Sequence, residues 1–423
     1  VYIWRYEQMP QNWKNANIVP IFKKGSRKLC GNYRGISLLS IAGKIMARII
    51  LNRIIEKITP NILPETQCGF RNSRSTIDMV FSLRQIQEKC TEQNLELYAV
   101  FIAFTKAFDT VLREGLWSVL KKFSFTEKVI NLIKALHVGM QAKVVQGRDT
   151  SNEFGVTNGF KQGCVLAPTL LSLYLTAMLE VAFKDVHEGI YIQTRLGADL
   201  FNVTQFKSKS YTTKQLFREM LFADDSVLVA HSAADMQVLL DHFAQAAAQF
   251  SLKINIQKTE CLYQPIKLIH PPPEPEVIMI EQNPLTPAAD FTYLGSTVSS
   301  TAKIDKELRN RLGKASAAYG KLQHRLWNNR HVSIRVKCKV YRAVVLSSLL
   351  YGAEAWTIYR TQVKKLSAFM MRQLRDIMSV KWYDKITNEE ILRRANMPCM
   401  ADILIKRNLR WLGHVHRMDN DRL

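Results

Sequence analysis

Two adjacent aspartates, Asp224 and Asp225, interrupt an otherwise apolar run over residues 220–230. Burying two neighbouring carboxylates is costly unless a metal ion neutralises them. Successive residues of a regular strand point to opposite faces, so both acids can serve one site only at the tip of a tight hairpin. We therefore predict a hairpin turn within residues 222–227 that holds a metal ion. The alternative, a pair of exposed turn acids, is disfavoured by the apolar flanks.

The charge balance points to a polyanionic partner. The chain has 423 residues, with 59 Lys and Arg against 36 Asp and Glu and a net charge of +23. That profile suits a protein that works on nucleic acid, although a basic surface without a ligand is the simpler alternative. The 7 cysteines occur singly, so neither a zinc cluster nor a disulfide framework is indicated.

The length predicts two or three subdomains, and the patterning predicts mixed strand and helix. The longest apolar stretch, residues 166–183, contains several polar residues, which favours a buried helix over a membrane span. Strand followed by helix recurs through the first half of the chain, which predicts an α+β domain around the acids. Strands are expected at residues 17–25, 98–104 and 221–230, and helices at residues 40–57, 75–90, 114–123 and 127–136.

The second half reads as a connector followed by basic helices. The Pro-rich residues 263–287, with Pro271 to Pro273 at their centre, predict an extended connector around one short strand. Further helices are expected at residues 360–379 and 389–417, with Trp411 in the helical core. His414 and His416 do not share a helix face, which argues against a metal site there. A helical apolar stripe consists of Leu308, Leu312, Ala315, Tyr319, Leu322 and Leu326, and the basic residues largely off it are Lys306, Arg309, Lys314, Lys321 and Arg325.

Six motifs occur in a specific order. They are Asn32-Tyr-Arg-Gly-Ile-Ser-Leu-Leu39, Gln67-Cys-Gly-Phe-Arg71, Lys106-Ala-Phe-Asp109, Lys161-Gln-Gly-Cys-Val-Leu-Ala-Pro168, the Phe222-Ala-Asp-Asp225 box and Tyr293-Leu-Gly295. Together they resemble the reverse transcriptase domain of non-LTR retrotransposons, LINE-like elements of the RTE or jockey type. The resemblance covers essentially the whole chain and implies an RNA-directed DNA polymerase.

The resemblance also implies an architecture, the right-hand polymerase. It places fingers and a linker fragment at 1–97, the palm at 98–262, a connector with the primer grip at 263–300, the thumb at 301–350 and a basic helical region at 351–423. The chain opens on Val1 rather than Met, which predicts a fragment of a longer reading frame, and family members usually carry an endonuclease upstream.

One departure from the family pattern bears on catalysis. Nucleotidyl transfer uses two Mg²⁺ ions about 4 Å apart, held by carboxylates. The resemblance assigns Asp224 and Asp225 to this site, together with an Asp at position 103 opposite Asp224. This chain has Ala103 there. Asp109 lies six residues further on, beyond the expected strand, so we expect it not to substitute. We therefore predict a catalytically impaired copy.

Other roles follow from the resemblance alone. Arg34 and Lys24 would contact the incoming triphosphate, although either could be a general phosphate contact. Phe108 would pack beneath the sugar and select deoxynucleotides, with plain core packing as the alternative. Gln162 and Gly163 would approach the template–nucleotide pair. Lys258 would protonate the pyrophosphate leaving group, or be an exposed solubilising lysine. Leu294 and Gly295 would form the primer grip.

The implied partners are an RNA template, a DNA primer or target DNA, and deoxynucleoside triphosphates, with no membrane. No targeting signal is evident, so an intracellular protein of nucleus or cytoplasm is expected. The main alternative is a non-catalytic nucleic-acid-binding remnant or a host-retained derivative. A viral RNA-dependent RNA polymerase is disfavoured by Phe108, and a group II intron maturase by the wording of the first two motifs.

Overall fold

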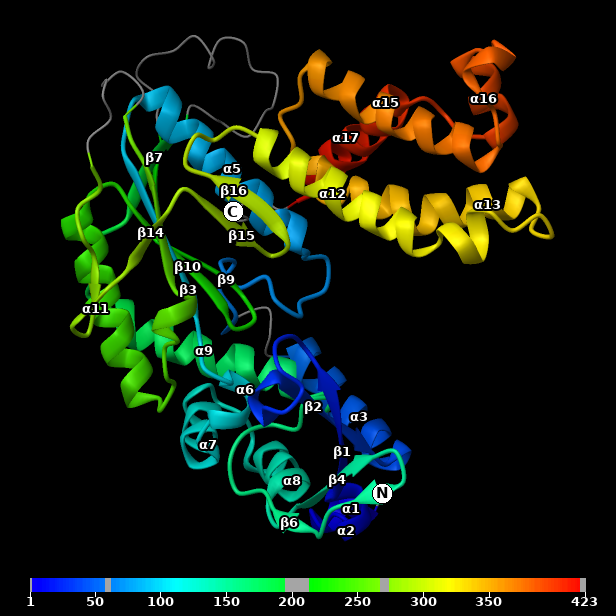
Figure 1. The fold of residues 1–423 in the computed structure, drawn as a ribbon. Helices are drawn as coiled ribbons and strands as arrows, with labels where there is room; N and C mark the ends of the chain where they lie inside the picture. Colours follow the sequence, from blue (N-terminus) through cyan, green and yellow to red (C-terminus); the bar gives the residue numbers. More distant parts are fainter. Residues whose placement is uncertain (1, 58–61, 195–212, 267–273, 419–423) are drawn as a thin grey trace.

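A five-stranded sheet lies at the centre of the molecule (Figure 1). The computed structural model describes residues 2–57, 62–194, 213–266 and 274–418. The strand order is β14-β11-β3-β10-β9, with β3 antiparallel to both of its neighbours. The bounds are β3 (Leu97–Ala103), β9 (Glu219–Phe222), β10 (Asp225–Ala230), β11 (Glu260–Gln264) and β14 (Thr286–Ala288). Since β14 pairs with β11, the sheet extends beyond residue 262.

Helices cover both faces of this sheet, which explains why β3 is apolar throughout rather than alternating. Val100 and Ile102 pack in one core with α9 (Ala167–Phe183) and α11 (Ala233–Gln249). Ala99 and Phe101 pack on the opposite face with α5 (Thr76–Gln93). The expectation that residues 166–183 form a buried helix is confirmed. No helix in the described ranges is both long and apolar enough to cross a membrane.

A second sheet lies at the N-terminal end. In it β1 (Ala16–Phe22) pairs antiparallel with β2 (Tyr33–Leu39) and parallel with β4 (Gln141–Gln146), and the short β5 (Asp149–Thr150) and β6 (Phe154–Gly155) pair with β4. The helices nearby are α1 (Tyr2–Tyr6), α2 (Gln11–Lys14), α3 (Ile41–Lys57), α7 (Arg113–Lys122) and α8 (Glu127–His137). The strand and helices expected before residue 137 are thereby confirmed.

The C-terminal helices share a core of their own. They are α12 (Asp305–Lys321), α13 (Ile334–Val340), the one-turn α14 (Ser347–Leu349), α15 (Arg360–Ile377), α16 (Asn388–Ala395) and α17 (Met400–His416). The predicted apolar stripe packs inward, while the five basic residues off it are exposed. Trp411 of α17 is buried, as expected, but it packs against Phe81 of α5, with ring centroids 5.3 Å apart. Beside it His414 Nε2 lies 3.0 Å from Asp78 Oδ1.

Two expectations for this half were wrong. Residues 389–417 form two helices rather than one, because Asn396 takes a left-handed conformation (φ 49°) and Pro398 cannot continue a helix. Among its described residues, the Pro-rich stretch also holds three short strands instead of one, namely β12 (Met279–Ile280), β13 (Asn283–Pro284) and β14. Pro271 to Pro273 lie outside the described residues.

Candidate active site

The two aspartates lie at the tip of a hairpin between β9 and β10. Phe222 pairs with Asp225, which leaves Ala223 and Asp224 as a two-residue turn. Ala223 takes φ 59°, a conformation that costs a residue with a Cβ about 1–2 kcal/mol. The hairpin predicted within residues 222–227 is confirmed.

The carboxylates themselves are more open than the sequence suggested. Met220, Leu221 and Ser226 are buried, but Asp224 is half-buried and Asp225 is exposed. Nearby protein atoms still desolvate Asp225, and together with the negative charge of Asp224 they raise its pKa to about 6. The prediction of two buried acids is therefore wrong: Ala223 of the turn is buried like the strand residues beside it, but the two carboxylates remain in contact with solvent.

Ala103 ends β3 directly beside the aspartate pair. It is paired in register with Asp225, not with Asp224 as expected. Directly paired residues of antiparallel strands place their side chains on one face with Cβ atoms about 5 Å apart. A carboxylate at position 103 would therefore stand next to that of Asp225, where this chain has only a methyl group.

The donor set falls short of a two-ion site. Asp224 and Asp225 supply two carboxylates, and Asp109 lies in the short helix α6 (Ala107–Thr110) beyond the end of β3, as expected. Across the described part of the chain, no three His, Cys, Asp or Glu side chains gather closely enough to hold a metal ion. The residues present therefore do not fit a site that needs three carboxylates.

The Gln162-Gly163 loop joins the region of Asp109 to the N-terminal sheet. The Gln162 side chain donates to Asp109 Oδ1 over 3.1 Å, and its carbonyl accepts from Ser37 N over 2.7 Å. Gly163 takes φ +114°, and a Cβ there would lie 2.7 Å from the Ser37 carbonyl oxygen. In this structure, therefore, the backbone of strand β2 leaves no room for a side chain at position 163.

The remaining predicted contacts occupy different surroundings. Arg34 on β2, Lys24 and Lys258 are all exposed. Phe108 is partly buried and packs against the main core, while its carbonyl accepts from Phe160 N over 2.6 Å. Packing against the core thus explains why part of the Phe108 side chain is buried. The side chains of Arg34, Lys24 and Lys258 remain available to a ligand.

Leu294 and Gly295 form the turn of a hairpin between β15 (Asp290–Tyr293) and β16 (Ser296–Ser299), and both have positive φ, 46° and 82°. The Leu294 carbonyl accepts from Tyr351 Oη over 2.9 Å, and the Gly295 carbonyl accepts from Arg311. Sequence reasoning missed these two partners, because nothing in the sequence links residues so far apart to the turn.

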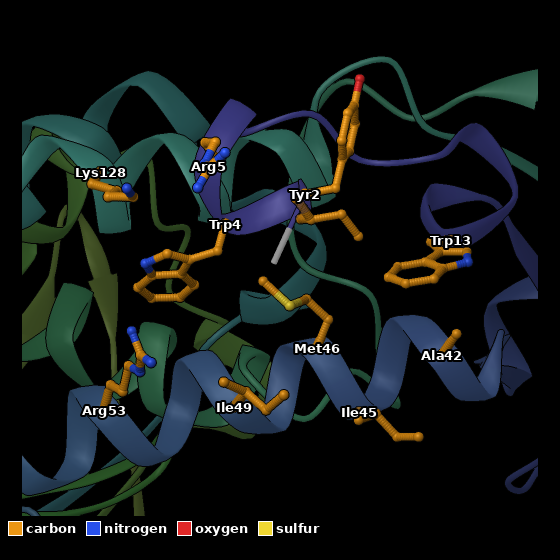
Figure 2. Close-up of a pocket in the computed structure, with 11 residues that line it drawn as sticks. Tyr2, Trp4, Arg5, Trp13, Ala42, Ile45, Met46, Ile49, Arg53 and Lys128 are labelled. Atoms are coloured by element: carbon orange, nitrogen blue, oxygen red, sulfur yellow. The ribbon is translucent and has the colours of Figure 1, made fainter.

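An apolar pocket of about 770 Å³ lies elsewhere, between α1 and α3 (Figure 2). Trp4, Trp13 and Met46 line it, and the Arg53 guanidinium stacks 3.8 Å from the Trp4 ring centroid. None of the predicted site residues lines this pocket.

A family model described as "Reverse transcriptase (RNA-dependent DNA polymerase)" matches residues 21–298. This range includes Ala103, the aspartate hairpin and the turn at Leu294 and Gly295. The chain belongs to the reverse transcriptase family. The α+β class and the right-hand polymerase fold predicted from the sequence are thereby confirmed.

Mobile-element polymerases are among its relatives. The reverse transcriptase chain is 25% identical over 429 residues to "Probable RNA-directed DNA polymerase from transposon X-element" of Drosophila melanogaster, covering 99% of this chain and 43% of that protein. It is 24% identical over 386 residues to "RNA-directed DNA polymerase from mobile element jockey" of Drosophila funebris, covering 90% and 39%. The chain spans about two fifths of these relatives' length. The resemblance to non-LTR retrotransposon reverse transcriptases is confirmed.

Among solved structures, apo telomerase from Candida Tropicalis is similar at a TM-score of 0.48 and 11% identity. The match covers 95% of this chain and 63% of that chain.

Proposed function

We propose that this chain is an RNA-directed DNA polymerase domain that grips primer and template but carries out nucleotidyl transfer poorly. The observation that carries the proposal is the pairing of Ala103 with Asp225 in an otherwise intact hairpin site. A site that lacks one carboxylate loses metal affinity and transition-state stabilisation of several kcal/mol, which lowers the rate by orders of magnitude.

The proposed arrangement follows the right-hand fold. The central sheet belongs to the palm, β1 and β2 belong to the fingers, α12 belongs to the thumb, and the β15–β16 turn is the primer grip. The family typically uses a divalent metal. Asp224 and Asp225 would coordinate Mg²⁺, but the described residues provide no third carboxylate beside them.

The proposed partners are an RNA template, a DNA primer or target DNA, and deoxynucleoside triphosphates. Exposed Arg34 and Lys24 support contacts to the triphosphate, and Lys258 is open enough to reach a leaving group. The net charge of +23 supports binding of a nucleic-acid backbone. An element that copies RNA into chromosomal DNA would need access to the nucleus.

Primer extension tests the proposal. A DNA primer annealed to an RNA template is incubated with Mg²⁺ and deoxynucleotides, and the unmodified chain is compared with Ala103→Asp and with the uncharged isostere Ala103→Asn. We expect extension only by Ala103→Asp, and equal duplex binding by all three. Efficient extension by the unmodified chain would show that the account of the metal site is wrong.

The second candidate is a nucleic-acid-binding protein without catalysis, which the alanine at position 103 also favours. The same assay separates the two. If Ala103→Asp binds the duplex but does not extend, further parts of the site have been lost and the binding function is the better description.

A further inference from the structure

The loop that carries the Gln67-Cys-Gly-Phe-Arg71 motif lies against the aspartate hairpin. Cys68 N donates to Leu221 O over 2.9 Å, and Leu221 N donates to Thr66 O over 2.8 Å. These bonds place the loop alongside β9, with Gln67 as the parallel bridge partner of Leu221. The motif, so far only a family marker, thus touches the strand that leads into Asp224.

The Gln67 side chain reaches the hairpin turn itself. It is fully buried, and its Oε1 accepts from Ala223 N over 3.1 Å and from Gly69 N over 2.9 Å. Its Nε2 lies 3.5 Å from Ala223 O. One amide group therefore contacts both backbone polar groups of the residue that immediately precedes Asp224.

Ala223 is a residue that needs such support. It occupies the first central position of a two-residue hairpin at φ 59°, a position that favours glycine. Gly69 allows the loop to come close enough, since a Cβ there would lie 2.1 Å from Ala223 N. Core packing alone explains neither the left-handed conformation of Ala223 nor the glycine at position 69.

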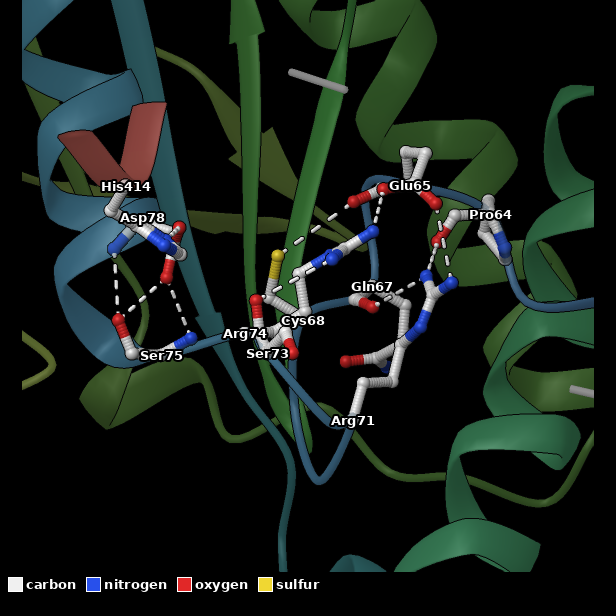
Figure 3. A network of polar contacts seen from close by, with 10 residues as sticks. All are labelled: Pro64, Glu65, Gln67, Cys68, Arg71, Ser73, Arg74, Ser75, Asp78 and His414. Carbon is white, nitrogen blue, oxygen red and sulfur yellow. Dashed lines mark hydrogen bonds and ion pairs between the residues drawn. The ribbon is translucent and has the colours of Figure 1, made fainter. Parts of the chain in front are cut away.

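The loop is itself held in place (Figure 3). The Arg71 guanidinium donates to the carbonyls of Pro64 and Gln67 over 2.7 and 3.2 Å. Glu65 pairs with both Arg71 and Arg74. Gln67 therefore projects from a fixed support toward the turn.

We infer that Gln67 is a positioning residue, which holds Ala223 in its left-handed conformation and so fixes the direction in which Asp224 leaves the turn. This role rests on the proposed function, because it matters for chemistry only if the hairpin is the polymerase site. The bracing itself, however, is a property of the protein without any ligand.

Hydrogen exchange measures the bracing directly. In Gln67→Met, which keeps the side-chain volume but loses the amide, the peptide spanning residues 219–226 should exchange roughly tenfold faster. The control is Gln87→Met, which removes another buried amide, bonded to Gln264 and Ser299, and should leave this peptide unchanged.

A rescue separates bracing from general packing. Glycine adopts positive φ without support, so adding Ala223→Gly to Gln67→Met should restore most of the protection. If exchange in this peptide is unchanged in Gln67→Met, or is not restored by Ala223→Gly, the inference is overturned. Should Gln67→Met fail to fold, Gln67→Asn, which is one methylene too short to span the gap, takes its place with the same expected pattern.

A functional arm keeps the two proposals apart. In Ala103→Asp protein, adding Gln67→Met should lower kcat for primer extension at least tenfold with little change in KM, and Ala223→Gly should recover it. If exchange responds as expected but Ala103→Asp does not extend, the bracing stands and the proposed function fails. If Ala103→Asp extends equally well with Met at position 67, the positioning role fails.

Discussion

At the scale of single residues, position 103 bears on the stability of the sheet as well as on the proposed loss of catalysis. An aspartate there would stand beside Asp225 on one sheet face, and like charges directly opposite one another destabilise a sheet. Without divalent cations, Ala103→Asp should therefore be less stable than Ala103→Asn by about 1 kcal/mol in urea unfolding. Adding Mg²⁺ should remove the difference. Equal stability of the two variants in chelator would show that the side chains at these positions do not face each other.

His137 makes the stability of the fold depend on pH. Burial lowers its pKa to about 3, aided by the charges of Lys161 and Arg113, whereas in the unfolded chain the pKa is near 6.5. The unfolded chain takes up the proton first, so the fold loses stability as pH falls below about 6.5, on the order of 2 kcal/mol by pH 5. His137→Gln should lose less between pH 7 and 5. Identical losses in both proteins would contradict a buried neutral imidazole.

Features of single residues could be predicted from the sequence where they depend on neighbouring residues in the chain. The Asp224-Asp225 pair could be assigned to a hairpin tip, because two acids on one strand side require a turn. Their exposure and the pairing of Ala103 with Asp225 could not be predicted, since both depend on strand register. The part that Gln67 plays was missed for the same reason, since its partner lies 156 positions away in the chain.

At the scale of elements, the buried ion pair between Glu307 and Arg311 of α12 is hydrogen-bonded to the β15–β16 hairpin. Glu307 is 1% exposed and accepts from Ser296 Oγ, Thr297 N and Arg311 Nε, over 3.1, 2.7 and 2.7 Å. Replacing it with glutamine would leave the buried Arg311 without a counter-charge. Glu307→Gln should therefore cost about 3–5 kcal/mol of unfolding free energy.

The matched control for that pair lies on the surface side of α16. Glu390 forms ion pairs with Arg393 and Arg394, both 2.7 Å long, but water screens them. Glu390→Gln should therefore leave the urea midpoint nearly unchanged. If both glutamate variants shift the midpoint equally, burial does not account for the strength of the Glu307 pair.

Element boundaries were predictable where capping is local. Ser75 caps α5 with a reciprocal Asp78 bond, and the start of that helix was placed correctly. The break between α16 and α17 was missed, because the apolar period continues across Asn396 and Pro398. The pattern of apolar and polar side chains does not reveal where a single residue adopts a left-handed backbone conformation and ends a helix.

At the scale of the whole molecule, the sequence predicted the individual helices and strands better than the contacts between distant elements. The α+β domain and the basic helices were expected, but the seating of α17 on α5 through Trp411, Phe81, His414 and Asp78 was not. Such contacts join residues more than 300 positions apart, and helical periodicity says only that an apolar face exists. Which element covers that face is decided by the tertiary structure.

The overall charge yields a prediction that does not depend on catalysis. A chain of net charge +23 should bind an RNA–DNA duplex with an affinity that falls steeply with salt, whether or not Mg²⁺ is present. The exposed cations of α12 are the proposed contacts. Replacing Arg309, Lys314 and Lys321 with glutamine should reduce the slope of log K against log salt by roughly one unit per lost phosphate contact.

A second triple variant controls for net charge. Lys121, Lys122 and Lys128 are also exposed, but they lie on α7 and α8, at the opposite end of the molecule from α12 in Figure 1. Replacing them with glutamine removes the same charge, so a purely non-local attraction would change the salt dependence equally in both variants. We expect a reduced slope only in the α12 variant, measured by fluorescence anisotropy across a salt series. Equal slopes would show that the protein attracts nucleic acid by its total charge and that α12 does not contact the duplex.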